Sequence, residues 1–349
     1  MVFRGAHKKG ENMKYRTLGD TGILVSELCF GAMTFGGTGT WTPVGKTQQE
    51  EADQLVGLAL DAGINFFDTA NIYSTGISEQ ILGKALGTKR KDIILATKVR
   101  GKMGEGVNQT GLSRVHIMHQ VDESLRRLGT DYIDLYQIHG FDILTPLEET
   151  LRALDDLVHS GKVRYIGCSN LKAWQLMKSL WISDKNSFNK FKSLQAYYSI
   201  AGRDLEREIV PLLEDQNLGL MVWSPLAGGF LSGKYRRNQM PEEESRRKEF
   251  DFPPINKEKA FDIIDIMDEV SKAHNASVAQ VALAWLLHQK VVTSVILGVK
   301  NEKQLRDNLK STEIHFTEDE LNKLNEVSKL TPEYPGWMVD FMQEDRIVN

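Results

Sequence analysis

The chain has 349 residues, of which 41% are hydrophobic and 26% are charged, so it is long enough to bury a large core. Its formal net charge is −4, which argues against the basic surface that neutralises nucleic-acid phosphates. The most apolar run, 277–292, contains Gln280, His288 and Lys290 and has too few uninterrupted apolar residues to span a bilayer. We therefore expect no nucleic-acid partner and no membrane span, and we interpret this run as a core-facing helix.

The ends of the chain and its cysteines add little further structure. Residues 1–12 are short, basic and without pattern, and are interpreted as a disordered leader or a cloning remnant, with residues 13–349 as a single domain. Cys29 and Cys168 lie in apolar, strand-like runs, where a thiol usually behaves as a small buried hydrophobe. Nothing indicates a disulfide framework, so a cytoplasmic location is expected.

Strand-like and helix-like patterns alternate from the first third of the chain to its end. A hairpin comes first, in "YRTLGDTGILVSEL", with Gly-Asp-Thr-Gly as its turn. Eight runs rich in β-branched or aromatic residues follow, at 27–32, 64–68, 92–97, 133–138, 163–168, 193–197, 219–223 and 293–297. Helical patterns separate them, at 47–63, 78–86, 113–128, 146–160, 172–182, 204–217, 257–274 and 301–309. Alternation of this kind predicts parallel strands with crossover helices, and eight repeats predict a (β/α)8 TIM barrel.

One long segment falls outside the repeat. Residues 226–256 follow the seventh strand, and a loop of this length in a compact domain is usually either functional or disordered. It lies after the carboxyl end of a strand, which is where the active sites of barrels are built. A tail after residue 310 also lies outside the repeat.

Four proton-bearing side chains are expected at the carboxyl ends of strands two, three and four: Asp68, Tyr73, Lys98 and His139. Taken singly, each has a structural explanation, as a cap, a solvated lysine or a structural histidine. Together on one rim they predict a site for proton transfer. An ammonium group beside Asp68 stays charged, and a fixed positive charge near a phenol favours its ionised form, so Tyr73 could act as a general acid.

The same stretches resemble the signatures of a known family. "FFDTANIYSTGISEQILGKAL", "ILATKV", "LYQIHG" and "YIGCSN" are similar to motifs of the aldo-keto reductases, and the resemblance covers nearly the whole chain. It implies hydride transfer, without a metal, between a nicotinamide cofactor and the carbonyl of an aldehyde, ketone or sugar. It further implies that Tyr73 protonates the carbonyl oxygen, that His139 orients this oxygen, and that Lys98, held by Asp68, tunes the phenol.

The resemblance also implies a cofactor site. It assigns the nicotinamide carboxamide to Ser169, Asn170 and Gln195 and a stacking role to Trp223, for which simple core packing is the alternative. "SPLAGGFLSGK" is similar to the segment that wraps the pyrophosphate, with contacts from Ser224, Leu226, Gly228 and Lys234.

The last strand and helix, "SVILGVKNEKQLRDNL", resemble the family's adenosine-phosphate motif, with Gly298, Lys300, Gln304 and Asn308 at matching positions. Lys300, with Arg246 or Arg247 of the long loop, could neutralise a 2′-phosphate, which favours NADP(H) over NAD(H). In the mixed-charge run 242–250, Arg246 is the position we select.

The sequence departs from the family pattern at two places. Ser74 and Thr75 follow Tyr73 where a Gly is common, and the loop 226–256 resembles that of the branch that includes potassium-channel β subunits. Two functions therefore stay open: a reversible NADPH-dependent reductase, and a slow-turnover regulatory or interaction protein that keeps the cofactor.

Other chemistries find less support in the sequence. The glycines of "GKMGEGVNQTG" do not have the GxGxxG spacing of a Rossmann site, and His116 and His119 share a helix face but lack a third metal ligand. Substrate selectivity is expected from the loop after the first barrel strand (Met33, Phe35, Trp41), from Phe141 and from the tail. The sequence does not predict the substrate, the direction of reaction or the oligomeric state.

Overall fold

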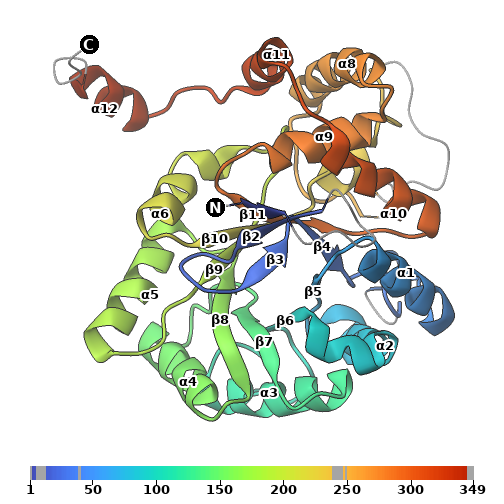
Figure 1. Ribbon diagram of the computed structural model, residues 1–349. Coiled ribbons are helices and arrows are strands. Elements are labelled where there is room, and N and C mark those ends of the chain that lie inside the picture. Colours follow the sequence, from blue (N-terminus) through green and yellow to red (C-terminus); the bar gives the residue numbers. More distant parts are fainter. Residues whose placement is uncertain (1, 5–12, 38–40, 238–246, 248–249, 344–349) are drawn as a thin grey trace.

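The computed structural model describes residues 2–4, 13–37, 41–237, 247 and 250–343. It confirms the predicted barrel (Figure 1). The closed sheet has the strand order β10-β11-β4-β5-β6-β7-β8-β9, and its paired strands are parallel. These strands are β4 (Leu28–Gly31), β5 (Phe66–Asp68), β6 (Ile94–Val99), β7 (Ile133–Ile138), β8 (Val163–Ser169), β9 (Ser193–Tyr197), β10 (Gly219–Trp223) and β11 (Val292–Leu297).

The barrel strands are buried on both faces, as parallel strands covered by helices must be. An outer core of apolar side chains fills the space between the strands and the helices. A smaller inner cluster fills the base of the barrel, and it includes Leu18 and Val25 from the N-terminal hairpin together with strand residues such as Phe66 and Met221. The hairpin, β2 (Lys14–Thr17) and β3 (Leu24–Ser26), therefore packs against the interior residues at the amino ends of the strands.

Helices surround the sheet in the order expected from the sequence (Figure 1). They are α1 (Gln49–Asp61), α2 (Ile77–Leu86), α3 (Arg114–Leu128), α4 (Leu147–His159), α5 (Ala173–Asn186), α6 (Ile209–Asp215), α8 (Lys257–Ala273), α9 (Val278–Leu287), α10 (Glu302–Leu309), α11 (Glu318–Ser328) and α12 (Gly336–Gln343). All ten residues of α9 are buried, which confirms the core-facing helix. Helix α12 extends away from the barrel, and none of its residues is buried.

One expectation needs correction. The helix predicted over 204–217 is divided into a short 3-10 turn, Asp204–Glu206, and α6. Pro211 explains the division, because its nitrogen has no hydrogen to donate and a proline is tolerated only in the first turn of a helix.

Part of the segment interpreted as a disordered leader has a described structure. Val2–Arg4 forms strand β1, which pairs antiparallel with β2 in the register Phe3↔Tyr15. Pairing through backbone groups at the free edge of β2 needs no side-chain pattern, so no motif in the sequence indicates it. Residues 1 and 5–12 lie outside the described part, and the division into a leader and one domain from residue 13 stays a prediction.

None of the helices in the described ranges combines the length and the apolar character that a membrane span requires. Within the same ranges, no three His, Cys, Asp or Glu side chains gather in a way that could hold a metal ion. Cys29 and Cys168 are both buried free thiols.

Candidate active site

A buried ammonium group lies at the centre of the predicted site. Lys98 is fully buried, and its Nζ donates to Asp68 Oδ2 at 2.6 Å, to the backbone oxygen of Thr69 at 2.8 Å and to Tyr73 Oη at 3.3 Å. Strands β5 and β6 are neighbours in the sheet, and this brings the three side chains together at their carboxyl ends. Strand β6 continues one residue beyond Lys98, to Val99, whereas the sequence predicted an end at residue 97.

Tyr73 is held in place by an unusual turn. It begins a short 3-10 segment, Tyr73–Gly76, in which Ser74 and Thr75 have left-handed φ values of 48° and 54°. Ser74 is buried, and its Oγ donates to the backbone oxygen of Phe35 and accepts from the nitrogen of Gly37, each at 2.9 Å. These bonds offset the cost of a left-handed serine and tie the loop after β4 to the turn that carries the phenol. The departure from glycine at this position thus has a structural role.

Two aromatic rings flank the phenol of Tyr73. Its ring centroid is 5.1 Å from that of Trp41 and 5.7 Å from that of His139, both in edge-on arrangements. The predicted selectivity residue Trp41 is therefore in contact with the predicted acid. Tyr73 itself is 7% exposed, so most of its surface is covered while a small part stays accessible.

The protonation states follow from burial and charge. Burial alone would lower the pKa of Lys98, but the carboxylate of Asp68 and the oxygen of Tyr73 outweigh it and raise this pKa above its ordinary value. Burial, with the positive charges of Lys98 and Arg100, lowers the pKa of His139 from 6.5 to about 3. At neutral pH the site therefore combines a charged ammonium with a neutral imidazole, which carries one N–H donor.

Two amide side chains hold the second oxygen of Asp68. Gln195 Nε2 donates to Oδ1 at 2.8 Å and Gln137 Nε2 donates to it at 3.2 Å. Sequence reasoning missed Gln137, although one signal was present. Gln137 lies on β7 two residues before His139, which directly follows the strand, and alternate residues of an extended chain share a face. Gln195 was assigned to the cofactor, and the structure adds this contact to Asp68.

The residues assigned to the nicotinamide end are joined by hydrogen bonds. Ser169 Oγ donates to the backbone oxygen of Gln195 at 2.9 Å. Asn170 has a left-handed φ of 55°; its Nδ2 donates to the backbone oxygen of His139 at 3.2 Å, and its Oδ1 accepts from Trp223 Nε1 at 3.0 Å. One chain of contacts thus connects β8, β9 and β10 with the backbone of His139.

Trp223 has aromatic neighbours of its own. Its ring stacks on Phe252 with centroids 5.7 Å apart and planes within 7°, and it lies 5.2 Å from Tyr197. Phe252 belongs to the long loop, so the structure brings that loop onto the residue predicted to stack on the cofactor. The sequence did not single out Phe252.

A turn of left-handed residues follows β10. Ser224 Oγ accepts from the nitrogen of Gly228 at 2.9 Å, and Gly228 has a φ of 66°. A Cβ on Gly228 would lie 2.4 Å from the backbone oxygen of Phe252, so only glycine allows this approach. Arg247 is 7% exposed, and its guanidinium donates to the oxygens of Ala227 and Pro253 at 2.6 and 2.9 Å.

The remaining residues assigned to the cofactor divide into two groups. At the start of α10, the nitrogen of Lys300 donates to Gln304 Oε1 at 2.9 Å, Asn308 is buried one turn further on, and Gly298 is exposed in the loop before them. Leu226 is partly buried and Lys234 is exposed, before and after the turn of residues 227–232. Arg246 lies outside the described residues. Arg247, the alternative to it, is engaged with the backbone of its own loop.

Comparison with known proteins agrees with this geometry. The sequence model of the Aldo/keto reductase family matches residues 27–329, which cover all eight barrel strands and the four tetrad positions, Asp68, Tyr73, Lys98 and His139. The chain belongs to the aldo/keto reductase family.

Relatives of this aldo/keto reductase carry several kinds of name. An uncharacterized oxidoreductase of Bacillus subtilis is 37% identical over 93% of the chain and 100% of the relative. A putative aryl-alcohol dehydrogenase of Schizosaccharomyces pombe is 36% identical over 89% of the chain and 95% of the relative. A probable voltage-gated potassium channel subunit beta of Arabidopsis thaliana is 33% identical over 93% and 99%. The branch suggested by the long loop is thus confirmed, and a general oxidoreductase role is supported.

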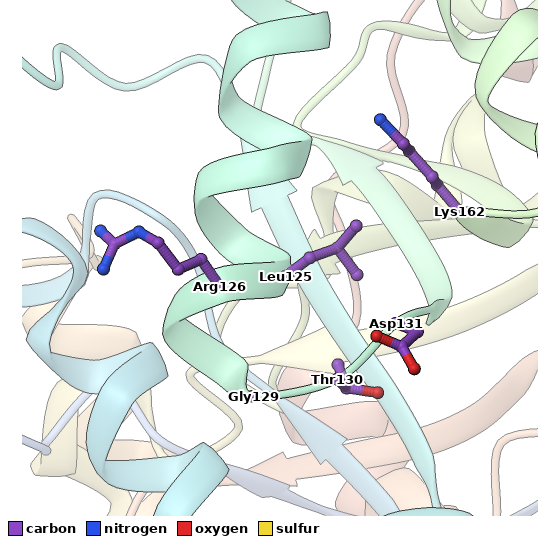
Figure 2. Close-up of a pocket in the computed structure, with 6 residues that line it drawn as sticks. All are labelled: Leu125, Arg126, Gly129, Thr130, Asp131 and Lys162. Atoms are coloured by element: carbon purple, nitrogen blue, oxygen red, sulfur yellow. The ribbon is translucent and has the colours of Figure 1, made fainter.

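A surface hollow of this aldo/keto reductase lies at the C-terminal end of α3 (Figure 2). Its lining precedes the starts of β7 and β8, so it is at the amino ends of the strands, opposite the rim that carries Asp68 and Lys98. Two of its cations, Arg126 and Lys162, already form ion pairs with Glu123 and Asp122. The lining residues are Leu125, Arg126, Gly129, Thr130, Asp131 and Lys162.

We expect the lowered pKa of His139 to appear as a pH-dependent stability of this aldo/keto reductase. Between about 6.5 and about 3, the unfolded chain binds a proton at this imidazole that the folded chain does not bind. The free energy of unfolding should therefore fall as the pH drops through this window. In His139→Gln this contribution should disappear, as measured by urea denaturation between pH 4 and 8. An imidazole of His139 that titrates near pH 6.5 by NMR in the folded protein would contradict the expectation.

Proposed function

We propose that this protein is an NADP(H)-dependent reductase that transfers a hydride reversibly to the carbonyl of an aldehyde, ketone or sugar, with Tyr73 as the general acid. The observation that carries the proposal is the contact of Tyr73 Oη with the buried Lys98 ammonium at 3.3 Å, beside a neutral His139. A charged donor that has no room to rotate away is suited to favour negative charge on the phenol oxygen.

In the reduction, Tyr73 delivers its proton to the carbonyl oxygen while negative charge develops there. The ammonium of Lys98 stabilises the phenolate that remains, and Asp68 keeps Lys98 charged and oriented. The neutral imidazole of His139 donates its N–H to the substrate oxygen. Preorganised donors of this kind contribute about 3 kcal/mol each to stabilising the transition state. In the oxidation of an alcohol the same groups act in reverse, with the phenolate of Tyr73 as the base.

The donor set agrees with a nicotinamide carboxamide. A nicotinamide cofactor, when bound, supplies or accepts the hydride. Asn170 Nδ2 and Gln195 Nε2 each have a second N–H beyond the bond they make within the protein, and Ser169 Oγ has lone pairs to accept a carboxamide N–H. Trp223 is proposed to hold the nicotinamide ring. Ser224, Leu226 and Gly228, in the turn after β10, are proposed to hold the pyrophosphate, with Lys234 adding positive charge.

The preference for NADP(H) is assigned to Lys300, together with Arg246 and with Gly298, Gln304 and Asn308 around the adenosine phosphate. Lys300 is exposed at the start of α10, where the helix dipole also favours an anion. We expect Lys300→Ala to weaken the binding of NADPH by about 10-fold, the loss of one charge-assisted contact, and to leave NADH within about 2-fold. Titration of the protein with each cofactor by fluorescence measures this. Equal losses for both would remove Lys300 from the 2′-phosphate site.

A second function is favoured by one specific observation. Arg247 ties Ala227 to Pro253, and Phe252 covers one face of Trp223, an arrangement suited to holding a cofactor for a long time. Two of the relatives are named as probable voltage-gated potassium channel subunits beta. A slow-turnover regulatory protein is therefore the alternative.

Aromatic aldehydes are the first substrates to test. They are favoured by the relatives named as putative aryl-alcohol dehydrogenases and by the ring of Trp41 against Tyr73. A cytoplasmic location and a single domain over 13–349 belong to the same proposal.

The test is oxidation of NADPH, and then of NADH, by the purified protein with a panel of aromatic aldehydes, dicarbonyls and sugars. Turnover on the order of 1 per second or faster on at least one carbonyl supports the reductase. Tight binding of NADPH without turnover on the panel supports the regulatory alternative. Failure to bind either cofactor would contradict both.

A further inference from the structure

Arg100 has a conformation that few residues other than glycine adopt. It lies one residue beyond the end of β6 and two residues beyond Lys98, and its φ is 148°. Such backbone conformations cost on the order of 1–3 kcal/mol and persist where the surrounding structure holds them, often at functional sites. Here two bonds hold the residue: its backbone oxygen accepts from the nitrogen of Gly111 at 2.9 Å and from Thr110 Oγ1 at 3.3 Å.

The side chain of Arg100 is anchored at one atom. Its Nε donates to the backbone oxygen of Phe141 at 3.0 Å, and its Cδ and Nε lie alongside Gly140. The two terminal nitrogens, with four N–H groups, have no hydrogen-bond partner among the residues that the structure describes. The guanidinium is therefore fixed in position while its charged end is exposed.

A neighbouring acid does not neutralise Arg100 by pairing. Burial raises the pKa of Asp142, but its hydrogen bonds and the charge of Arg100 outweigh burial. The pKa of Asp142 is therefore lowered below its ordinary value. Yet its carboxylate accepts from the nitrogens of Leu112 and Leu144 and from Thr145 Oγ1, at 2.7, 3.0 and 2.7 Å. No ion pair joins it to Arg100 in the described part of the chain. Within the described residues, the two terminal nitrogens of the Arg100 guanidinium therefore keep their N–H donors at the carboxyl rim of the barrel.

This cation acts on the reacting end of the site. Arg100 is one of the groups that lower the pKa of His139, so its charge is felt at the imidazole proposed to contact the substrate oxygen. The loop on which it rests, Gly140–Phe141, directly follows His139. The ring centroid of Phe141 lies 6.1 Å from that of Trp174.

From these observations we propose that Arg100 is a specificity-determining residue that binds an anionic group of the substrate, so that the preferred substrates are carbonyl compounds bearing a carboxylate or a similar anion. This inference rests on the proposed reductase function and narrows its substrate class. A guanidinium pairs with a carboxylate through two parallel N–H bonds, and both terminal nitrogens of Arg100 are available for them. The anchored Nε reduces the side-chain entropy lost on binding.

The test compares charged and neutral forms of one aldehyde. The substrates are the 2-, 3- and 4-formylbenzoates and their methyl esters, with NADPH, and the variants are Arg100→Met, which keeps the apolar stem, and Arg100→Lys. Lys102→Met is the matched control, because Lys102 is a nearby exposed cation that pairs with Glu105. We expect the wild type to prefer at least one formylbenzoate over its ester. In Arg100→Met, kcat/KM for that anion should fall by about 10- to 100-fold, mainly through KM, while the ester changes by less than about 2-fold. Arg100→Lys should lie between them, and Lys102→Met should equal the wild type.

Two results would overturn the inference while leaving the reductase intact: turnover of esters and anions without preference, or an equal loss for both in Arg100→Met. If the wild type reduces none of these aldehydes, the reductase proposal fails for this substrate class. Calorimetric titration with benzoate and benzamide then decides the anion site separately. The anion site is supported if benzoate binds more tightly than benzamide, and if this preference is lost in Arg100→Met and kept in Lys102→Met. Equal binding of benzoate and benzamide contradicts the anion site.

Discussion

Tyr73→Phe is expected to lower kcat for carbonyl reduction by about 10²- to 10⁴-fold, the range for loss of a positioned general acid. The ring, its edge-on contacts with Trp41 and His139, and most of its buried surface are retained, so the fold should not change. Only the hydroxyl that receives the Lys98 contact at 3.3 Å is removed. The affinity for NADPH should stay within about 2-fold of the wild type, because the lost hydroxyl serves proton transfer and not cofactor binding. Fluorescence titration measures this affinity independently of the rate.

Tyr132→Phe is the matched control for this substitution. Tyr132 precedes β7 at the opposite end of the barrel, where its ring lies between the guanidinium groups of Arg90 and Arg164. Its hydroxyl can be removed without touching the rim, so the rate should remain that of the wild type. If Tyr73→Phe retained the full rate, the proton would have to come from another group, and His139 would be the first to examine.

Lys98→Met is expected to have the second large effect, on stability as well as on rate. The substitution keeps the length of the side chain but leaves the buried carboxylate of Asp68 without its cation. Breaking a buried ion pair in this way costs about 3–5 kcal/mol. Urea denaturation measures this loss, and the rate of carbonyl reduction should fall by at least about 10²-fold because the phenol loses its charged neighbour.

The double variant Asp68→Asn with Lys98→Met separates the two effects. Removing both charges should recover part of the lost stability, because no isolated buried charge remains. The amide oxygen that replaces the carboxylate can still accept from Gln137 and Gln195, which donate to the same position in the wild type. The rate should not recover. Recovery of both would mean that Lys98 acts only by holding the fold, and it would remove the ammonium from the proposed mechanism.

The barrel could be predicted because its signals are local and repeated. The strand runs, such as 133–138 and 219–223, appear in the structure at the predicted places, since strands buried on both faces are rich in apolar residues, as GLMVW of β10 is. The tetrad followed from the same rule. Side chains at the carboxyl ends of neighbouring strands, such as Asp68 and Lys98, must lie close together in a closed parallel sheet.

What the sequence did not predict depends on contacts between distant segments. The bond from Gln137 to Asp68 joins residues 69 positions apart, and the stacking of Phe252 on Trp223 depends on the path of a long loop without periodic pattern. Strand β1 pairs with β2 through backbone groups, over residues that carry no strand pattern that the sequence singled out. The left-handed Ser74 is permitted by bonds to Phe35 and Gly37, which no local propensity reveals. In each case tertiary contacts override or supplement a local signal.

The guanidinium of Arg247 has a consequence for how the long loop moves. It bonds to Ala227 at the start of the segment and to Pro253 near its end, pairs with Asp251, and lies 5.6 Å from the ring of Phe230. If only one end of the loop moved away, a buried N–H donor of Arg247 would lose its acceptor, which costs free energy. A state with only one of the two contacts broken is therefore unfavourable. The two described ends of the loop, at Ala227 and at Pro253, should therefore separate in one cooperative event, and the exchange of any molecule held beneath them should follow the frequency of that event.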